Sequence, residues 1–428
     1  MNSHVVWMLC AALLAWTSPA PAQPPPAQLK RGALNLTLPQ ALRKAAAASP
    51  RLTAADRTIG MTEGRREQAN VLPNPTLSFD VDNFAPGGSV PGQPVETTLL
   101  LSQLIELGGK RDARVAAALG DYDAARLERE ATRLELFSET TIAFVGVLAA
   151  QRRIALLDRH VAALERLVPL MQRRTDAGAS SPAEVARVQT AVGFARVERE
   201  RTRTTFAVAR RELGVLMGLD TPDFATVSGD FGRLSRPAPF ETVVKAIEDN
   251  PQLTRWTAIR ARRDADLISA RLKAVPDVTA SVGWRRYSDT PESALRLGVS
   301  MPIPVLDRNR GGIREAQELA QRTEAKRAVN RLTLIAVVGK AHDSANGALH
   351  QIDLLRRVVL PAARNTLSTV EAGYDQGRFT VLEILDAYQR VADAELMEHD
   401  ALASLHISLA TIEGLIGSPV VLAQARGK

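Results

Sequence analysis

Two stretches of this sequence, 75–104 and 277–303, each hold two short runs in which apolar and polar residues alternate. In the first run, Leu77, Phe79 and Val81 alternate with polar neighbours, and a loop rich in glycine and proline then leads to the second run. Alternation with period two over about ten residues is typical of a membrane-spanning β-strand, which has one lipid face and one lumen face. A water-soluble hairpin gives the same pattern, but its recurrence as two matched pairs favours the membrane strand.

Four such strands in one chain cannot close a barrel. In lipid every backbone N–H and C=O needs a partner, so an open edge has to be paired. Eight strands are the usual minimum for closure, so two chains would supply eight strands and three chains twelve. The long helical segments begin directly after the strands and have to continue the barrel as a wide tube. We therefore expect a trimer with a twelve-stranded barrel.

The rest of the chain is predicted to be helical and internally duplicated. A short helical pair at 38–71 leads into the first strand pair, and a helix of about 65 residues then ends near Thr175, on the order of 100 Å long. The turn Asp176–Glu184 is matched by Asp375–Glu383, and the whole plan recurs roughly 200 residues later. The predicted divisions are a first repeat at 37–222, a second repeat at 223–418 and a C-terminal tail at 419–428.

The N-terminus is predicted to be a secretory signal peptide, residues 1–22, followed by a Pro-rich linker at 23–36. Val5–Trp16 is an apolar core of the right length, and the small residues Ala20 and Ala22 mark a cleavage site. The only cysteine, Cys10, lies inside this core. The mature chain would then have no thiol for a disulfide or a metal.

Composition argues against nucleic-acid binding and against enzymatic chemistry. The 54 basic and 47 acidic side chains are interleaved, which is typical of a mixed helical surface and not of one basic patch. His342 and His350, like His399 and His406, do not have the i, i+4 spacing of a metal-ligand pair. Because no set of acid, base, nucleophile and metal residues emerges at usable spacing, we expect no enzyme, no cofactor and no metal site.

Several segments carry a resemblance to a known family. They are Leu72-Pro73-Asn74-Pro75, the segment Gln103–Arg111, and the paired glycine turns that end the long helices. With the duplicated plan over nearly the whole mature chain, they resemble the outer-membrane factor, or TolC-like, family of efflux ducts. The sequence of the segment Glu106–Arg111 looks most like that of the family branch that serves heavy-metal efflux pumps of the cobalt–zinc–cadmium type.

The resemblance implies a mainly α fold with a membrane β-barrel portion, in which long helical hairpins join four β-strands per protomer. It implies a homotrimer in the outer membrane of a Gram-negative bacterium, with an α-helical barrel in the periplasm. The partners would be a periplasmic adaptor protein and an inner-membrane pump of the resistance–nodulation–division class, and the cargo divalent heavy-metal cations. The alternatives are a duct for drugs or for a secreted protein, and a periplasmic coiled-coil scaffold without a pore.

The helix-tip turns are the first candidate sites. By resemblance these turns form the periplasmic end and meet the adaptor, although glycine would also serve simply to reverse the chain. The matching residues are Gly178, Ser181 and Glu184 in the first repeat and Gly377, Thr380 and Leu382 in the second.

Glu383 and Asp386 are the second candidate, and their i, i+3 spacing puts both carboxylates on one helix face. By resemblance they line the periplasmic entrance, where three chains would form a cation-favouring ring that raises its own pKa values. An ordinary solvated stripe near a helix start is the alternative.

A third set of charges is expected to face the barrel lumen, as in any water-filled barrel. These residues are Asp80, Asp82, Glu96, Arg285 and Arg296.

Overall fold

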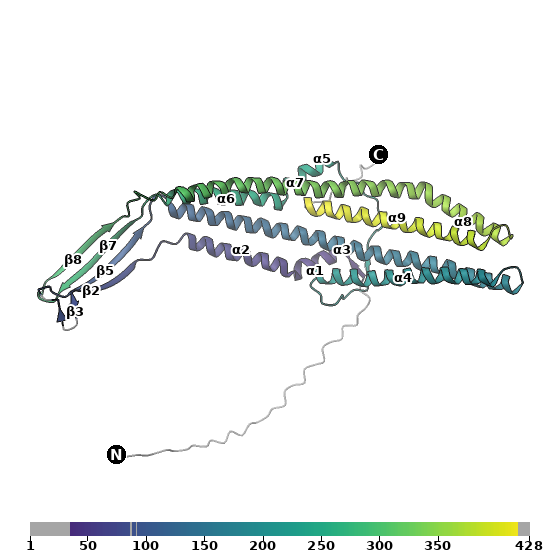
Figure 1. The fold of residues 1–428 in the computed structure, drawn as a ribbon, viewed down its shortest axis with the longest axis horizontal. Helices are drawn as coiled ribbons and strands as arrows, with labels where there is room; N and C mark the ends of the chain where they lie inside the picture. Colours follow the sequence, from purple (N-terminus) through teal and green to yellow (C-terminus); the bar gives the residue numbers. More distant parts are fainter. Residues whose placement is uncertain (1–34, 86–87, 91, 418–428) are drawn as a thin grey trace, which may run out of the picture.

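The structure is a computed structural model that describes residues 35–85, 88–90 and 92–417. The expected signal peptide and C-terminal tail lie outside the described residues, as does most of the linker. The last two linker residues belong to a strand, β1 (Asn35–Thr37). The protomer is elongated, with a β-sheet at one end and long helices over the rest of its length (Figure 1).

The sheet at one end of the molecule is antiparallel, with strand order β2-β5-β7-β8. Its strands are β2 (Thr76–Asp82), β5 (Glu96–Ile105), β7 (Val278–Tyr287) and β8 (Ser293–Ser300). The loop between β2 and β5 adds a small hairpin that was not predicted, formed by β3 (Phe84–Ala85) and β4 (Gly88–Ser89). Each repeat therefore contributes one strand pair, and the pairing of β5 with β7 joins the two repeats.

The strand register confirms the predicted alternation. Leu99 lies opposite Phe79 on one side and Trp284 on the other, and Thr98 lies opposite Asp80 and Arg285. Because residues that face each other across antiparallel strands share a face, one face is mainly apolar and the other mainly polar. The apolar face is open, with Phe79 66% exposed. An exposed apolar patch of this kind marks an interaction surface.

The helices agree closely with the predicted plan. The first repeat contains α1 (Leu38–Ala48), α2 (Pro50–Ala69), α3 (Lys110–Asp176) and α4 (Pro182–Leu216). The second repeat contains α5 (Phe240–Ile247), α6 (Pro251–Leu272), α7 (Arg310–Leu354), α8 (Leu360–Asp375) and α9 (Val381–Ile416). Proline at the first helical position begins α2, α4 and α6, where its missing N–H costs nothing.

One interruption distinguishes the second repeat from the first. A π-helical turn, η1 (Leu355–Val359), separates α7 from α8, and Pro361 is the second residue of α8. Proline has no N–H to donate and its ring crowds the carbonyl one turn earlier, so a wider turn relieves the clash. The sequence analysis treated this whole stretch as one helix and missed the break.

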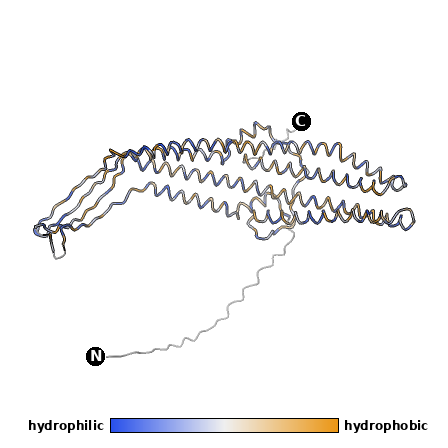
Figure 2. The backbone as a smooth tube through the Cα atoms, viewed as in Figure 1, coloured by the Kyte–Doolittle hydropathy of each residue, from blue (hydrophilic) through white to orange (hydrophobic). Residues whose placement is uncertain are grey.

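The two repeats pack against each other and share the main core cluster. α3 packs against α2, α4, α6 and α9. The main cluster contains Leu136 of α3, Leu213 of α4, Ile352 of α7 and Leu405 of α9. Apolar and polar residues are mixed along every long helix (Figure 2). Among the described helices, α3 alone has a window apolar enough to cross a membrane, and 39% of that window is already buried inside the protomer.

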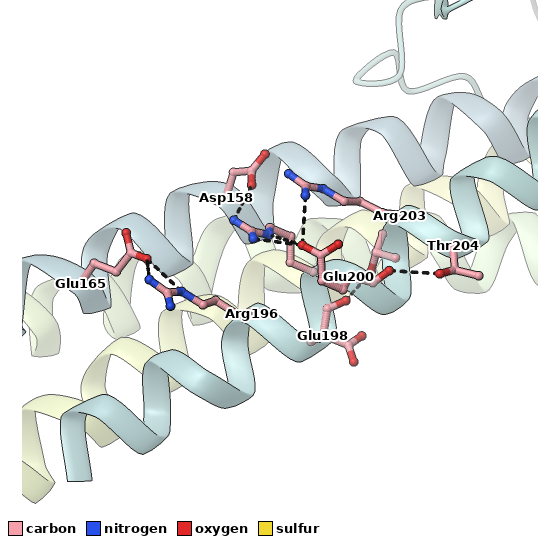
Figure 3. Close-up of polar contacts among 9 residues, drawn as sticks. Asp158, Glu165, Arg196, Glu198, Glu200, Arg203 and Thr204 are labelled. Atoms are coloured by element: carbon pink, nitrogen blue, oxygen red, sulfur yellow. Dashed lines mark hydrogen bonds and ion pairs between the residues drawn. The ribbon is translucent and has the colours of Figure 1, made fainter. Parts of the chain in front are cut away.

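Ion pairs flank the apolar seam between α3 and α4 (Figure 3). Glu165 lies 2.6 Å from Arg196 and Asp158 lies 3.6 Å from Arg199. Glu200 accepts from Arg199 at 3.0 Å. Since exposed pairs each contribute at most about 1 kcal/mol, these contacts set the register of the hairpin more than its stability.

A short parallel pair ties the beginnings of the two repeats together. β1 pairs with β6 (Thr226–Ser228), so that Leu36 lies opposite Val227. Both side chains are buried in the main core. A strand of three residues is too short to show alternation, which is why the sequence analysis did not find this pair.

α3 and α6 approach each other closely at Gly120, where an added Cβ would be 2.9 Å from the Cα of Arg262. We predict that Gly120→Ala forces the two helices apart and costs about 1–3 kcal/mol of unfolding free energy. Gly146→Ala on the same helix is the control, because nothing lies within 4 Å of its added Cβ. That change should stabilise the protein by about 0.5–1 kcal/mol. Denaturant unfolding in detergent measures both, and an unaltered midpoint for Gly120→Ala would contradict the prediction.

Candidate functional site

The first helix tip is a turn that its own residues stabilise. Gly178 has φ +70°, the left-handed conformation that ends α3. Ser181 is the N-cap of α4, and its hydroxyl accepts from the backbone N–H of Ala183 at 3.2 Å. The carboxylate of Glu184 accepts from the hydroxyl of Ser180. The three predicted residues therefore lie together in one turn, and each has a structural role there.

The second helix tip has the same design with a stronger cap. Gly377 has φ +74° and its N–H donates to the carbonyl of Tyr374 at 3.0 Å. Thr380 and Glu383 form a capping box at the start of α9. Leu382, the second residue of α9, has a side chain that is 56% exposed. Both tips lie at the end of the molecule opposite the sheet (Figure 1).

Glu383 uses its carboxylate to hold the start of α9. It accepts from the backbone N–H of Thr380 at 2.7 Å and from the Thr380 hydroxyl at 2.9 Å. These hydrogen bonds, the backbone one first, lower the pKa of Glu383 below its usual value. In the protomer this direction is opposite to the rise expected for a ring of carboxylates, because the hydrogen bonds favour the charged form.

Asp386 lies one turn further along α9 and is freer than Glu383. Its carboxylate is 3.2 Å from the guanidinium of Arg390, and its side chain is 62% exposed. An exposed i, i+4 pair holds a side chain only weakly. Of the two predicted gate residues, Asp386 is therefore the one that remains available to another molecule.

A contact between the two hairpins near the tips was missed by the sequence analysis. Arg174 of α3 donates to the carbonyl of Tyr374 at 3.0 Å, and its guanidinium lies 4.7 Å from the centre of that ring. The Tyr374 hydroxyl donates to the sulfur of Met171 at 2.9 Å. Arg174 and Tyr374 stand just before the two matched glycine turns, and that position is the only sequence signal that could have identified them.

The five predicted lumen charges lie on one face of the sheet, as the register requires. Arg285 reaches across to β5, where it contacts Glu96 at 2.5 Å and donates to the Thr98 hydroxyl at 3.0 Å. Thr98 is 1% exposed beneath this network. The pair neutralises two of the five charges. Within the described part of the chain, the remaining three have no ion-pair partner.

Two further observations concern described residues outside these three groups. Among the described residues, no three His, Cys, Asp or Glu side chains gather closely enough to hold a metal ion. A groove of about 300 Å³ lies between α3, α8 and α9, lined in part by His160, Glu371 and Tyr388. The Tyr388 hydroxyl donates to Glu371 at 2.5 Å, and burial raises the pKa of Tyr388 to about 12.

The chain matches one family of known proteins over most of its length. Residues 41–219 and 242–418 match the family described as outer membrane efflux protein. The chain is 29% identical to the cobalt-zinc-cadmium resistance protein CzcC of Cupriavidus metallidurans, covering 89% of this chain and 90% of that protein. It is 25% identical to the nickel and cobalt resistance protein CnrC of the same organism, covering 70% and 71%.

Solved structures share the fold. A membrane protein from Pseudomonas aeruginosa superposes with a TM-score of 0.77 at 20% identity, covering 89% of this chain and 92% of that one. A crystal structure of CusC gives a TM-score of 0.77 at 16% identity, covering 90% and 93%.

The cap of α9 provides a prediction at the second tip. Thr380→Ala removes the hydroxyl that bonds both the N–H and the carboxylate of Glu383, so helix initiation should weaken by about 0.5–2 kcal/mol. Hydrogen exchange at 381–384 should accelerate accordingly. The control is Thr369→Ala in the middle of α8, where the hydroxyl only donates back to Asn365.

The same cap has a defined pH dependence. Because the pKa of Glu383 is lowered, its stabilisation is complete above the ordinary value of 4.5 and is lost as the pH falls below it. Exchange at the tip should therefore rise below pH 4.5 in the wild type and change less in Thr380→Ala. Equal exchange in both proteins at every pH would show that the box does not hold the tip.

Proposed function

This chain belongs to the outer membrane efflux protein family, and on that premise we propose that it is the exit duct of a tripartite efflux system for divalent heavy-metal cations. Proteins of this family are transport channels of the outer membrane. The observation that carries the proposal is a sheet with one exposed apolar face, one polar face and two unpaired edge strands, continuing into helices as long as about 100 Å.

A homotrimer satisfies the edges of the sheet. β2 and β8 each have a neighbour on one side only, and in lipid their free backbone groups have no water to bond. Pairing β8 of one copy with β2 of the next extends the sheet around a circle, and three copies give twelve strands. The apolar face then meets lipid, and the face with Asp80, Asp82 and Arg296 lines the channel.

The metal cargo is supported by relatives and not by a binding site. The names of CzcC and CnrC describe resistance to cobalt, zinc, cadmium and nickel. The segment Glu106–Arg111, which resembles the same branch, holds the junction between sheet and helices in this protomer. Lys110 lies 2.8 Å from Asp277, and the Leu107 N–H donates to the same carboxylate at 3.0 Å. These residues bind each other, so their role is structural.

The partners in this proposal are a periplasmic adaptor at the helix tips and an inner-membrane pump of the resistance–nodulation–division class. Exposed Leu382 offers an apolar contact at the tip, and Gly377 leaves the turn open, with nothing within 4 Å of an added Cβ. The tips and the sheet stand at opposite ends of the protomer, so one end can meet an adaptor while the other lies in the membrane.

Growth on metals tests the function directly. We expect a deletion strain to be sensitive to zinc, cobalt, cadmium or nickel, and the wild-type gene to restore growth. Gly377→Arg should fail to restore it although trimers still form, because a bulky cation then covers the docking turn. Gly92→Arg is the matched control, since Gly92 also has a positive φ and open space but lies in the loop at the other end.

Three outcomes would contradict parts of this proposal. Sensitivity to hydrophobic drugs with metals unchanged would leave a duct with another cargo. Full resistance with Gly377→Arg would remove the adaptor from this turn. If a measurement of the native size in mild detergent gave a monomer or a dimer, it would contradict the twelve-stranded barrel.

The acidic entrance gives a separate electrical prediction. In a trimer, Asp386→Asn removes one negative charge per chain without touching the cap of α9, so cation selectivity in a planar bilayer should fall. Asp393→Asn, two turns further along α9, is the control, because it removes the same charge from the same helix at a position outside the predicted entrance. Identical selectivity in wild type and Asp386→Asn would argue against a gate at this position.

A further inference from the structure

The segment between β6 and α5, residues 229–239, runs across the helices, and we call it the strap (Figure 1). It contains the buried ring of Phe231, which is 7% exposed and belongs to the main core. No part of the proposed transport function uses this segment.

Side chains of three long helices hold the backbone of this connection. Gln151 of α3 exchanges two hydrogen bonds with Val227, just before the strap, at 3.1 and 3.3 Å. His406 of α9 bonds the carbonyl of Phe231 at 2.9 Å, and His342 of α7 bonds the carbonyl of Ala238 at 3.1 Å. Together with β6, the strap therefore links α3 of the first repeat to α9 and α7 of the second.

A third histidine, His399, lies beneath the strap and differs from His406 and His342 in its contacts. His399 of α9 is 5% exposed, and its ring centre lies 5.0 Å from that of Phe231. Its Nδ1 is buried and has no hydrogen-bond partner. A neutral ring tolerates this because Nδ1 can be the unprotonated nitrogen, whereas a charged ring would bury an N–H without an acceptor.

The charges around His399 do not compensate for this burial. Burial lowers the pKa of His399 most; Asp400 raises it, Arg153 of α3 lowers it and Glu398 raises it. Asp400 is 2.7 Å from Arg153, and Glu398 is 2.5 Å from Arg356 of η1, so both carboxylates already have partners. The strap adds Asp230, which is exposed beside Phe231. His399 therefore stays neutral while Phe231 covers it.

We propose that the contact between the strap and α9 is sensitive to acid. When His399 takes up a proton, Phe231 moves out of its packed position and the strap detaches from α9. His406 and His342 each donate to a carbonyl of the strap and so hold its backbone. The buried Nδ1 of His399, in contrast, has no acceptor for a second N–H.

The direction of the pH dependence follows from proton linkage. With the strap in place the pKa of His399 is lowered, and with the strap released it returns toward the ordinary 6.5. The released state thus binds more protons below pH 6.5, so acid favours release and the strap is held fully above that pH. Acidification around the helical body would loosen the tie between the two repeats while the rest of the core stays packed.

Hydrogen exchange of the full-length protein in detergent tests the proposal. Protection factors of amides in 229–239, which exclude the intrinsic pH dependence of exchange, should fall between pH 7.5 and pH 5.0. The largest fall that one proton with a released-state pKa of 6.5 can produce at pH 5.0 is about 30-fold. Unchanged protection of the strap over this range would overturn the proposal.

Two leucine variants separate His399 from other titrating groups. His399→Leu keeps an apolar side chain beneath Phe231 and should abolish the fall in protection at pH 5.0. His160→Leu is the matched control, because His160 is a half-buried histidine with a pKa lowered by burial, in the groove between α3 and α9 and away from the strap. A fall that persists in His399→Leu would overturn the proposal.

A variant on the strap itself gives an independent readout. Phe231→Ala removes the ring that covers His399, so protection of 229–239 should already be low at pH 7.5 and change little at pH 5.0. Wild-type protection at both pH values in Phe231→Ala would contradict the role of that ring.

Discussion

The backbone at the edges of the four-stranded sheet constrains everything else in this structure. A strand in hydrocarbon cannot leave its N–H and C=O groups unpaired, and β2 and β8 each have one free edge. The helices start only a few residues beyond the strands, with Ile105 followed by α3 at Lys110. In the proposed trimer, the closed circle of strands would therefore also set the spacing of the helices, and the helix surfaces would have to pack against the neighbours that this circle brings together.

Most of the fold could be predicted because its signals are local. Period-two alternation gave the strand faces, which the register confirms, and proline and glycine gave the helix ends. The missed features depend on distant partners. β1 has too few residues to show a period, and the bonds of Gln151, His342 and His406 to the connection at 227–238 cannot be read from spacing. From spacing alone both histidines could be described only as poor metal ligands, whereas each bonds a carbonyl of the strap.

The candidate site residues show how structural and functional roles share one side chain. Their positions were predictable, since the glycine turns and the lumen face follow from pattern, but their partners were not. Glu383 was expected to titrate with its neighbours, yet its hydrogen bonds to Thr380 lower its pKa. A ring that includes Glu383 would therefore keep its charge in moderately acidic surroundings. Arg285 and Glu96 likewise neutralise each other on the polar face and leave Asp80, Asp82 and Arg296 to set its charge.

The pairing of β1 with β6 and of β5 with β7 bears on how the chain is made. Asn35 pairs with Thr226, and Ile105 pairs with Val278. Strands at the start of the chain therefore cannot complete their pairing until residues much later in the sequence are present. Such contact order slows folding. During export, which delivers the N-terminus first, the strands of the first repeat stay exposed until more than half of the polypeptide has arrived. A truncated chain would thus be a candidate for aggregation and degradation, not a smaller working pore.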